Sequence, residues 1–375
     1  PGFAAWRAGF RRRALAAGVP AATFDAAFAG VGVNATVLER DAFQPEFVRP
    51  IWEYLDRAVS ETRVARGREL RAEKADALAR IEAAYGVDAE AVVAIWGLES
   101  AYGAVYGDIN VIEALATLAY EGRRRSFGEE QLIAALRILA AGDIAPERMV
   151  GSWAGAMGHT QFIPTSYLAY AVDFDNDGRR DLWTEDAIDA LASAANYLSR
   201  FGWEQGAPVF AEVRLPAGFD YGLADGRARP VADWAARGVA PIGGGALSGP
   251  GAAELILPAG ANGPAFLTFR NFDVIKRYNN ATSYALAVGL LAERIRGGPG
   301  VRAAWPRGER PLSRSETEEM QRRLTTLGFD TGGTDGIIGP NTRAAIRAFQ
   351  ASRGAAADGH ASAALLETLR GESGG

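Results

Sequence analysis

Apolar residues recur with helical spacing along most of the first 200 residues of the chain. The pattern predicts helices over residues 4–17, 111–120, 129–140 and 186–201, because apolar side chains return every three or four positions. Residues 51–85 are rich in Arg, Glu and Ala, and their charges alternate in sign. Such alternation is typical of a solvated helix face, so we expect one long helix there.

The pattern changes after Trp203, where Gly and Pro become frequent and short β-like runs appear at 209–215 and 265–269. This indicates a small β-rich insertion, and residues 271–296 then return to a helical pattern. A Gly- and Pro-rich stretch follows, which is typical of a linker, and the last part of the chain predicts a compact helical module. The expected organisation is a domain over 1–296 with its insertion at 206–268, a linker over 297–312 and a module over 313–371.

Composition excludes several classes of protein. The 375 residues are 48% hydrophobic and 23% charged, as in soluble globular proteins. The net charge of -5 and the lack of a long basic stripe argue against a nucleic-acid partner. The absence of cysteine excludes a thiol nucleophile, and the two histidines, His159 and His360, are too far apart in sequence to suggest a metal cluster. The start at Pro1 without Met suggests a mature or trimmed form, in which a removed signal peptide would leave no trace.

One carboxylate interrupts the most apolar run of the chain, residues 94–103. Glu99 is the only charged residue between Glu90 and Asp108, and Trp96 lies one helical turn before it. A carboxylate held against apolar neighbours is poorly hydrated, which raises its pKa and keeps it protonated, ready to act as a general acid. The alternative is an ordinary helix-end glutamate with its carboxylate in water. We expect Asp88 to cap this helix.

A second informative run, residues 151–167, contains three glycines together with several polar side chains. The glycines allow close backbone approach, while Ser152, Gln161 and Tyr167 supply donors and acceptors. Small residues beside polar ones suit a groove for a polar polymer such as a sugar chain. A tightly packed turn with satisfied polar groups explains the same residues equally well.

The third run, residues 173–181, has the beginning of a calcium loop. Asp173, Asp175 and Asp177 occupy alternate positions and Gly178 follows, so that hard oxygen ligands converge as the chain curls round a cation. The carbonyl of Arg179 is the expected fourth ligand. The alternative is a solvated, Asp-rich turn.

The end of this loop departs from the usual pattern. Thr184 stands where a calcium loop of the EF-hand type has a bidentate glutamate. A later acid must then supply that ligand, and our first choice is Asp189, ahead of Asp186 and Glu185. A calcium sensor is a weak alternative function, because one incomplete loop lacks the usual second loop.

Five motifs together resemble the membrane-bound lytic murein transglycosylase B family. The resemblance extends over residues 1 to about 296, and the motifs follow the family's order. They are Glu-Ser-Ala-Tyr-Gly at 99–103, Gly-Ala-Met-Gly through Gln-Phe-Ile-Pro at 155–164, Tyr-Ala-Val-Asp at 170–173, Ala-Ala-Asn-Tyr-Leu at 194–198 and Asn-Phe-Asp-Val-Ile at 271–275. The resemblance implies a lysozyme-like helical fold and cleavage of peptidoglycan.

The resemblance also implies roles for individual residues. Glu99 would be the catalytic acid, and Ser152 would lie close to it and orient it. The expected substrate-binding residues are Met157, Gln161, Tyr197, Tyr278, Asn279 and Tyr284, with Arg124 and its neighbour Arg123 near the peptide stem. The expected ligands of a structural Ca²⁺ are Asp173, Asp175, Asp177, Arg179 and Asp189.

Family chemistry explains why one carboxylate suffices, whereas typical glycoside hydrolases need two. Glu99 would act as acid and then as base, while the C6 hydroxyl of N-acetylmuramic acid attacks C1 and leaves a 1,6-anhydro end. Two alternatives remain open: a lysozyme-type hydrolase, which requires a second acid, and a catalytically inactive wall-binding or scaffold protein. The resemblance further implies a periplasmic location, with membrane attachment left open.

The last part of the chain has a resemblance of its own. Residues 320–324, 327–329, 335–339, 348–350 and 358–359 resemble the peptidoglycan-binding domain that is appended to wall hydrolases. The overall prediction is therefore a mainly α protein, with a lysozyme-like catalytic domain, a small β-rich insertion and a C-terminal three-helix peptidoglycan-binding domain. We expect a monomer whose partners are glycan strands and other cell-wall enzymes.

Overall fold

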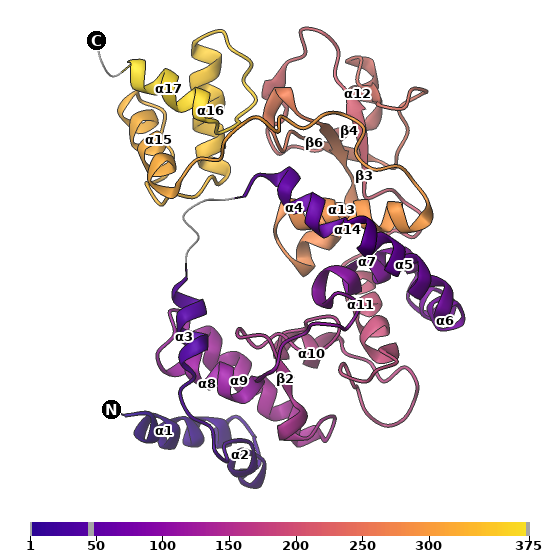
Figure 1. Ribbon diagram of the computed structural model, residues 1–375, viewed down its shortest axis with the longest axis vertical. Coiled ribbons are helices and arrows are strands. Elements are labelled where there is room, and N and C mark those ends of the chain that lie inside the picture. The colour runs from indigo at the N-terminus through magenta and orange to yellow at the C-terminus, as the bar shows by residue number, and fades with distance from the viewer. Residues whose placement is uncertain (1, 44–48, 373–375) are drawn as a thin grey trace. The chain divides into compact units, whose positions relative to one another are not determined.

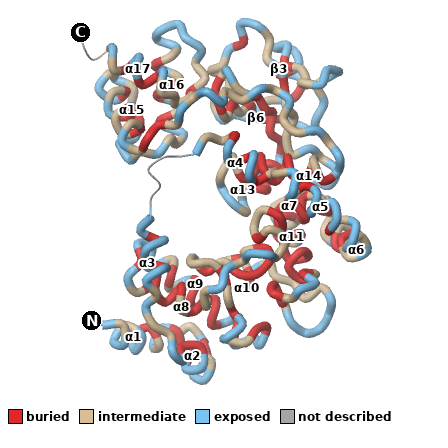
Figure 2. Tube along the Cα trace, viewed as in Figure 1, coloured by how far each residue is buried: buried red, intermediate tan, exposed pale blue. Residues whose placement is uncertain are grey.

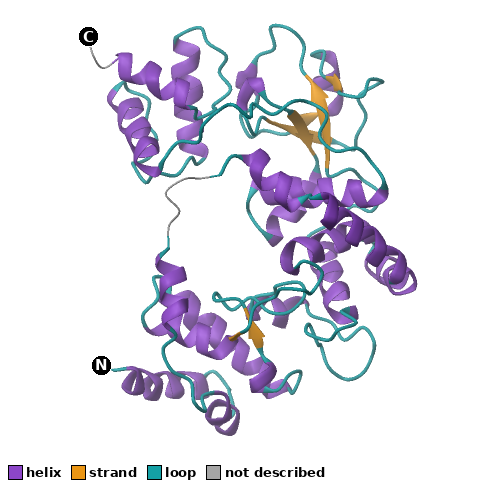
Figure 3. Ribbon diagram, viewed as in Figure 1, coloured by secondary structure: helices purple, strands orange, loops and turns teal. Residues whose placement is uncertain are grey.

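The computed structural model describes residues 2–43 and 49–372, and it is mainly helical (Figures 1 and 3). The chain forms two compact units, and each is described by itself. The first comprises residues 1–44 and 65–201, and the second comprises 45–64 and 202–375. Within the described ranges, no helix is long and apolar enough to cross a membrane.

Two buried helices form the centre of the first unit. In α7 (Ala89–Ser100) and α8 (Val111–Tyr120) nearly every residue is buried, because their sequences are apolar on all sides. Figure 2 shows this burial along α8 and the neighbouring α9. α9 packs on α8, and α11 packs on α6 and α7. The unit's other elements are α1 (Phe3–Ala16), α2 (Ala21–Ala27), α3 (Ala35–Ala42), α6 (Ala75–Tyr85), β1 (Ile109–Asn110), α9 (Arg125–Ala141), β2 (Val150–Gly151), α10 (Pro164–Tyr170) and α11 (Ile188–Arg200).

The long helix expected over residues 51–85 is wrong. The segment forms three helices, α4 (Ile51–Ala58), α5 (Glu61–Glu73) and α6. The Arg63 guanidinium donates to the carbonyls of Arg57 (2.7 Å) and Ala58 (2.9 Å), which satisfies the end of α4. The Ser60 hydroxyl accepts from the backbone N–H of Arg63 (3.3 Å) and starts the next helix. The helix expected over 271–296 is likewise divided, into α13 (Arg270–Tyr278) and α14 (Thr282–Arg296).

The second unit contains the small antiparallel sheet that the Gly- and Pro-rich stretch predicted. Its strand order is β4-β6-β7-β3-β5, and α12 packs against β4. Figure 3 shows the strands of this sheet in orange. Trp234 of α12 is fully buried, and its indole N–H donates to the carbonyl of Ala253 (2.9 Å). The elements are β3 (Phe210–Arg214), β4 (Arg229–Pro230), α12 (Val231–Ala236), β5 (Ala240–Pro241), β6 (Ala252–Ile256) and β7 (Ala265–Thr268).

The stretch after α14 contains no helix or strand, yet it is fixed to the second unit at several points. The Glu212 carboxylate of β3 accepts from the backbone N–H groups of Arg302 (2.9 Å) and Ala303 (2.7 Å). Arg307 forms a two-bond ion pair with Asp56 of α4. Residues 302–307 therefore run along β3 and α4, whereas the domain boundaries at 296 and 313 stay a prediction.

The C-terminal module consists of α15 (Arg314–Thr326), α16 (Pro340–Ser352) and α17 (Ala363–Glu372), which lie side by side (Figure 1). Their shared core includes Met320, Ile346, Phe349 and Leu366. α15 begins with a capping box, in which the Ser313 hydroxyl and the Glu316 carboxylate each accept from the other residue's backbone N–H.

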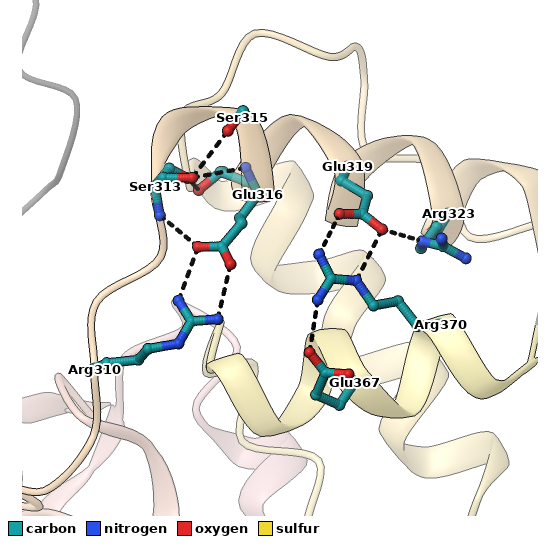
Figure 4. Close-up of polar contacts among 9 residues, drawn as sticks. Arg310, Ser313, Ser315, Glu316, Glu319, Arg323, Glu367 and Arg370 are labelled. Carbon is teal, nitrogen blue, oxygen red and sulfur yellow. Dashed lines mark hydrogen bonds and ion pairs between the residues drawn. The ribbon is translucent and has the colours of Figure 1, made fainter.

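Charged side chains form ion pairs between the helices on the surface of this module (Figure 4). The Glu319 carboxylate of α15 accepts from Arg370 of α17 and from Arg323, and these contacts lower its pKa to about 2. The Arg310 guanidinium holds Glu316 in the same way and also lowers that pKa to about 2. Both carboxylates are therefore charged at neutral pH, and Glu319 links the first helix of the module to the last.

Candidate active site and calcium loop

Glu99 lies in the last turn of α7 and is half-buried, at the end of a helix whose other side chains are almost all enclosed. Asp88 stands at the N-cap position of α7, but its side chain makes no capping hydrogen bond. The helix ends in three consecutive left-handed residues, Ala101 (φ 49°), Tyr102 (φ 61°) and Gly103 (φ 86°). Left-handed backbone costs a residue with a Cβ about 1–2 kcal/mol, so this turn is strained at two positions.

Packing against α7 holds the strained turn in place. The Tyr102 ring folds back over Gly97, where an added Cβ would lie 2.6 Å from the ring, and it meets the Trp96 ring edge-on at 5.6 Å. A residue larger than glycine at position 97 would displace Tyr102. The apolar run around Glu99 therefore includes an aromatic side chain from beyond the helix.

His159 joins the end of α7 to the second sequence run. The Trp96 indole N–H donates to Nδ1 of His159 (3.0 Å), and the Ser100 hydroxyl donates to the His159 carbonyl (2.7 Å). Ser100 Oγ also accepts from the backbone N–H of Gly103 (2.9 Å), so one hydroxyl ties the left-handed turn to His159. Burial lowers the pKa of His159, which keeps the imidazole neutral and Nδ1 able to accept. Sequence reasoning missed His159, Ser100 and these contacts.

Ser152 follows β2, which pairs with β1 beyond the turn that begins at residue 101. The backbone approaches closely here, because a Cβ on Gly107 would overlap the carbonyl oxygen of Gly151. Ser152 Oγ accepts from the backbone N–H groups of Ala154 (3.3 Å) and Ala156 (3.1 Å). These contacts occupy the acceptor side of the hydroxyl and leave its hydrogen to be donated elsewhere.

Gln161 and Met157 hold the glycine-rich run together. Gln161 has left-handed backbone (φ 53°), and its Nε2 donates to the carbonyls of Tyr106 (3.0 Å) and Gly158 (2.9 Å). The amide oxygen of Gln161 is then the part of the side chain available to a ligand. Met157 is fully buried and pairs in strand-like bridges with Gly151 and Phe162.

Two further predicted substrate-binding residues, Tyr197 and Arg124, belong to the first unit. Tyr197 of α11 is 8% exposed and meets the ring of Tyr170 edge-on at 4.8 Å. Arg124 precedes α9 and is half exposed, with its guanidinium 5.0 Å above the Phe127 ring and its Nε 4.0 Å from Asp41. Arg124 is thus placed beside a ring and an acid, with half of its side chain open to solvent.

The remaining predicted substrate-binding residues belong to the second unit. Tyr278 ends α13 and is half-buried, and Asn279 follows it in extended backbone and is exposed. Tyr284 lies in α14 and is buried, with 5% exposure. The break between the two helices therefore presents Asn279 at its surface.

The third sequence run curls as a calcium loop does. Asp173, Asp175 and Asp177 each bring a carboxylate oxygen within 4.8 Å of the others. Asp173 and Asp175 both accept from the backbone N–H of Asp177, and Gly178 (φ 90°) allows the sharp turn. Three carboxylates held this close repel one another, and a hard divalent cation is the partner that suits such a set of oxygens.

Asp189 joins the two ends of this loop. Its carboxylate accepts from the backbone N–H groups of Phe174 (2.7 Å) and Asp181 (3.0 Å), and burial raises its pKa to about 6. Arg179 is exposed, and its backbone N–H donates to Asp177. The structure thus places Asp189 beside the loop, while its part in metal binding stays a prediction.

Family models match nearly the whole chain. The model of the transglycosylase SLT domain matches residues 2–293, and a model of a peptidoglycan binding domain matches residues 313–369. Over 227 residues the chain is 36% identical to membrane-bound lytic murein transglycosylase B of Escherichia coli K12, which covers 59% of this chain. The chain matches 60% of the length of that relative.

Solved structures extend the similarity. SltB3 from Pseudomonas aeruginosa, solved in complex with NAG-anhNAM-pentapeptide, is 54% identical with a TM-score of 0.96, over 98% of this chain and 99% of that one. Slt35 from Escherichia coli, solved in complex with calcium, is 32% identical with a TM-score of 0.62, over 71% of this chain and 84% of that one. These matches confirm the predicted fold class and family. The chain belongs to the lytic transglycosylases that carry the transglycosylase SLT domain, here followed by a peptidoglycan binding domain.

Proposed function

We propose that this protein cleaves the β-1,4 bond between N-acetylmuramic acid and N-acetylglucosamine in peptidoglycan, with Glu99 as the catalytic acid and base. The observation that carries the proposal is the position of Glu99, half-buried at the end of the apolar helix α7 in a chain of the lytic transglycosylase family. Such surroundings disfavour the charged carboxylate, which suits a group that must first donate a proton.

In the first step Glu99 donates its proton to the glycosidic oxygen, and the bond to C1 of N-acetylmuramic acid breaks. The glutamate, now charged, takes the proton of the C6 hydroxyl of the same sugar, and that oxygen attacks C1. The product carries a 1,6-anhydro end, and Glu99 regains its proton. Because nucleophile and reacting carbon belong to one ring, the closure is intramolecular, an advantage of about 7–11 kcal/mol at best.

Ser152 is the residue that orients Glu99 in this proposal. Its oxygen already accepts from two backbone N–H groups, so its hydrogen is available to a carboxylate. A serine donating to Glu99 would fix which carboxylate oxygen faces the substrate. The other residues that we propose to bind the glycan are Gln161, Tyr197, Tyr278, Asn279, Tyr284, Met157 and Arg124.

Calcium has a structural role in this proposal. Asp173, Asp175 and Asp177 would hold the ion, with the Arg179 carbonyl and Asp189 as the further ligands. The bound ion would neutralise the clustered acids and stiffen the connection between α10 and α11. The relative Slt35 was crystallised with calcium, which supports this assignment.

The substrate also suggests where the protein works and what it meets. Peptidoglycan strands are the proposed partner of both the catalytic domain and the C-terminal module, whose match to a peptidoglycan binding domain supports this role. A periplasmic location gives access to the wall. We also propose that the protein is a monomer and that it contacts other cell-wall enzymes.

The decisive experiment is the digestion of purified cell wall by the full chain and by Glu99→Gln, with mass spectrometry of the released fragments. We expect anhydro ends from the wild-type protein and no turnover from the variant, which should still sediment with the wall. The exposed acid Glu121 offers a matched control, and Glu121→Gln should digest normally. Reducing ends would favour a lysozyme-type hydrolase, and full activity of Glu99→Gln would end the assignment.

A further inference from the structure

Val105 stands at the tip of the loop that follows Glu99, and its side chain is 71% exposed. Few large apolar side chains in the described part of the chain are as open to solvent. Isolated exposed apolar residues are common and need no explanation by themselves. What distinguishes Val105 is the loop that carries it.

The backbone of Val105 is bonded directly to the end of the proposed catalytic helix. Its N–H donates to the carbonyl of Ser100 (2.9 Å), the residue next to Glu99. The loop leaves α7 through the strained left-handed turn at Ala101 and Tyr102. Strained backbone persists only where surrounding contacts over-determine it, and it gathers at functional sites.

Contacts on the other side of Val105 fix the loop as firmly. The Tyr106 ring packs on the His159 ring at 5.4 Å, and Gln161 donates to the Tyr106 carbonyl (3.0 Å). Gly107 then abuts the backbone of Gly151. Residues on both sides of Val105 are anchored, whereas Val105 itself projects into solvent.

A rigid loop that presents an apolar side chain beside the catalytic acid is pre-organised for a contact with substrate. We propose that Val105 is a specificity-determining residue, which packs against a methyl-bearing substituent of the peptidoglycan strand next to the bond that is cleaved. This inference rests on the proposed function. Methyl groups of that kind occur on the N-acetyl groups of the sugars and on the lactyl-peptide branch, and the chemistry is the same for both.

The test compares Val105→Ser and Val105→Ile with the wild-type protein on soluble glycan strands. Burying one to two methyl groups is worth a factor of roughly four to fifteen in binding, so we expect Val105→Ser to raise KM by about that factor. The value of kcat should change little, because Val105 does not touch the reacting atoms, and Val105→Ile should keep the wild-type KM. Val33, another exposed valine, supplies the control, and Val33→Ser should leave KM unchanged.

Two substrates distinguish the sources of the methyl group. A KM defect on intact strands and on strands stripped of their peptides assigns the contact to a methyl group that stays on the sugars, either on an N-acetyl group or on the lactyl ether. A defect on intact strands alone assigns it to a methyl group of the peptide. An unchanged KM for Val105→Ser on both substrates overturns the proposal, provided that both variants melt within a degree of wild type. Activity that survives in Glu99→Gln would instead overturn the proposed function.

Discussion

Gly107 is the residue at which the architecture of the site is most sensitive to a single added methyl group. Its φ of 93° lies in the left-handed region, and a Cβ there would overlap the Gly151 carbonyl oxygen and lie 2.7 Å from the Ser152 nitrogen. Both obstacles are backbone atoms of the chain that carries Ser152. Gly107→Ala must therefore strain its own backbone and also push β1 away from β2.

Gly142, at the C-terminal end of α9, separates these two costs. It has nearly the same backbone (φ 83°), but a Cβ there would meet no atom within 4 Å. Gly142→Ala should therefore show only the left-handed penalty, about 1–2 kcal/mol. Gly107→Ala adds the cost of overpacking, roughly 1–3 kcal/mol, for a total of about 2–5 kcal/mol.

Thermal unfolding with and without wall substrate measures both effects. For a unit of 150–250 residues, 1 kcal/mol corresponds to about 2–4 °C in Tm. We expect Gly142→Ala to melt a few degrees below wild type with full activity, and Gly107→Ala to melt roughly 1.5 to 4 times as far below. Gly107→Ala should also digest wall more slowly at temperatures where it remains folded, because Ser152 moves with the strand. Equal losses of Tm in the two variants would refute the close approach of these segments.

Two further predictions concern the calcium loop and the C-terminal module. Calcium should raise the Tm of the wild-type protein but not the Tm of Asp175→Ala. The control is Glu69→Ala, which removes an acid from an exposed ion pair and should keep the response to calcium. If a chelator leaves the melting curve of the wild-type protein unchanged, the loop is a polar turn that binds no metal. Glu319→Gln should destabilise the module by up to about 1 kcal/mol at pH 7. The folded pKa of Glu319 lies near 2, below its usual value of 4.5, so this contribution is present above about pH 4.5 and is lost as the pH falls toward 2. Melting curves of both proteins from pH 7 to 2 should therefore converge, and a constant gap would contradict the ion-pair explanation.

Local sequence patterns were sufficient to predict the helices that are buried because their own residues are apolar. The helix over 111–120 is found with the predicted bounds, since its residues are apolar on nearly every side. The break between α4 and α5, at residues 59–60, was missed because it contains neither Gly nor Pro. It depends on Ser60 and on the Arg63 guanidinium, which bonds the carbonyls that end α4. Such a side-chain cap competes with helix continuation only in the folded geometry.

In the candidate site too, some residues could be predicted from local sequence and others could not. Glu99 was predicted as the catalytic acid from its isolation in an apolar run, and the three aspartates were predicted as metal ligands from their spacing, because each signal is local in the sequence. Both assignments stay predictions. His159 offered no such signal. Its ring accepts from Trp96 and its carbonyl accepts from Ser100, some 60 positions earlier, so its role exists only once α7 and the glycine-rich run are packed together.

Residues that can be predicted from local sequence and residues that depend on packing would contribute differently to the proposed chemistry. In the proposed mechanism Glu99 donates a proton and therefore needs poor hydration, which the apolar sequence of α7 would supply locally. It also needs a fixed direction, which a helix end cannot supply, because the last turn of a helix frays unless something else bonds it. Here the hydroxyl of Ser100 bonds both the left-handed turn and the His159 carbonyl, and Gly107 seats the following loop on the backbone beside Ser152. In the proposed mechanism, the poor hydration of the Glu99 carboxylate would come from its neighbours in sequence, whereas its direction would come from the glycine-rich run. A variant that weakens the second should then lower the rate without abolishing it.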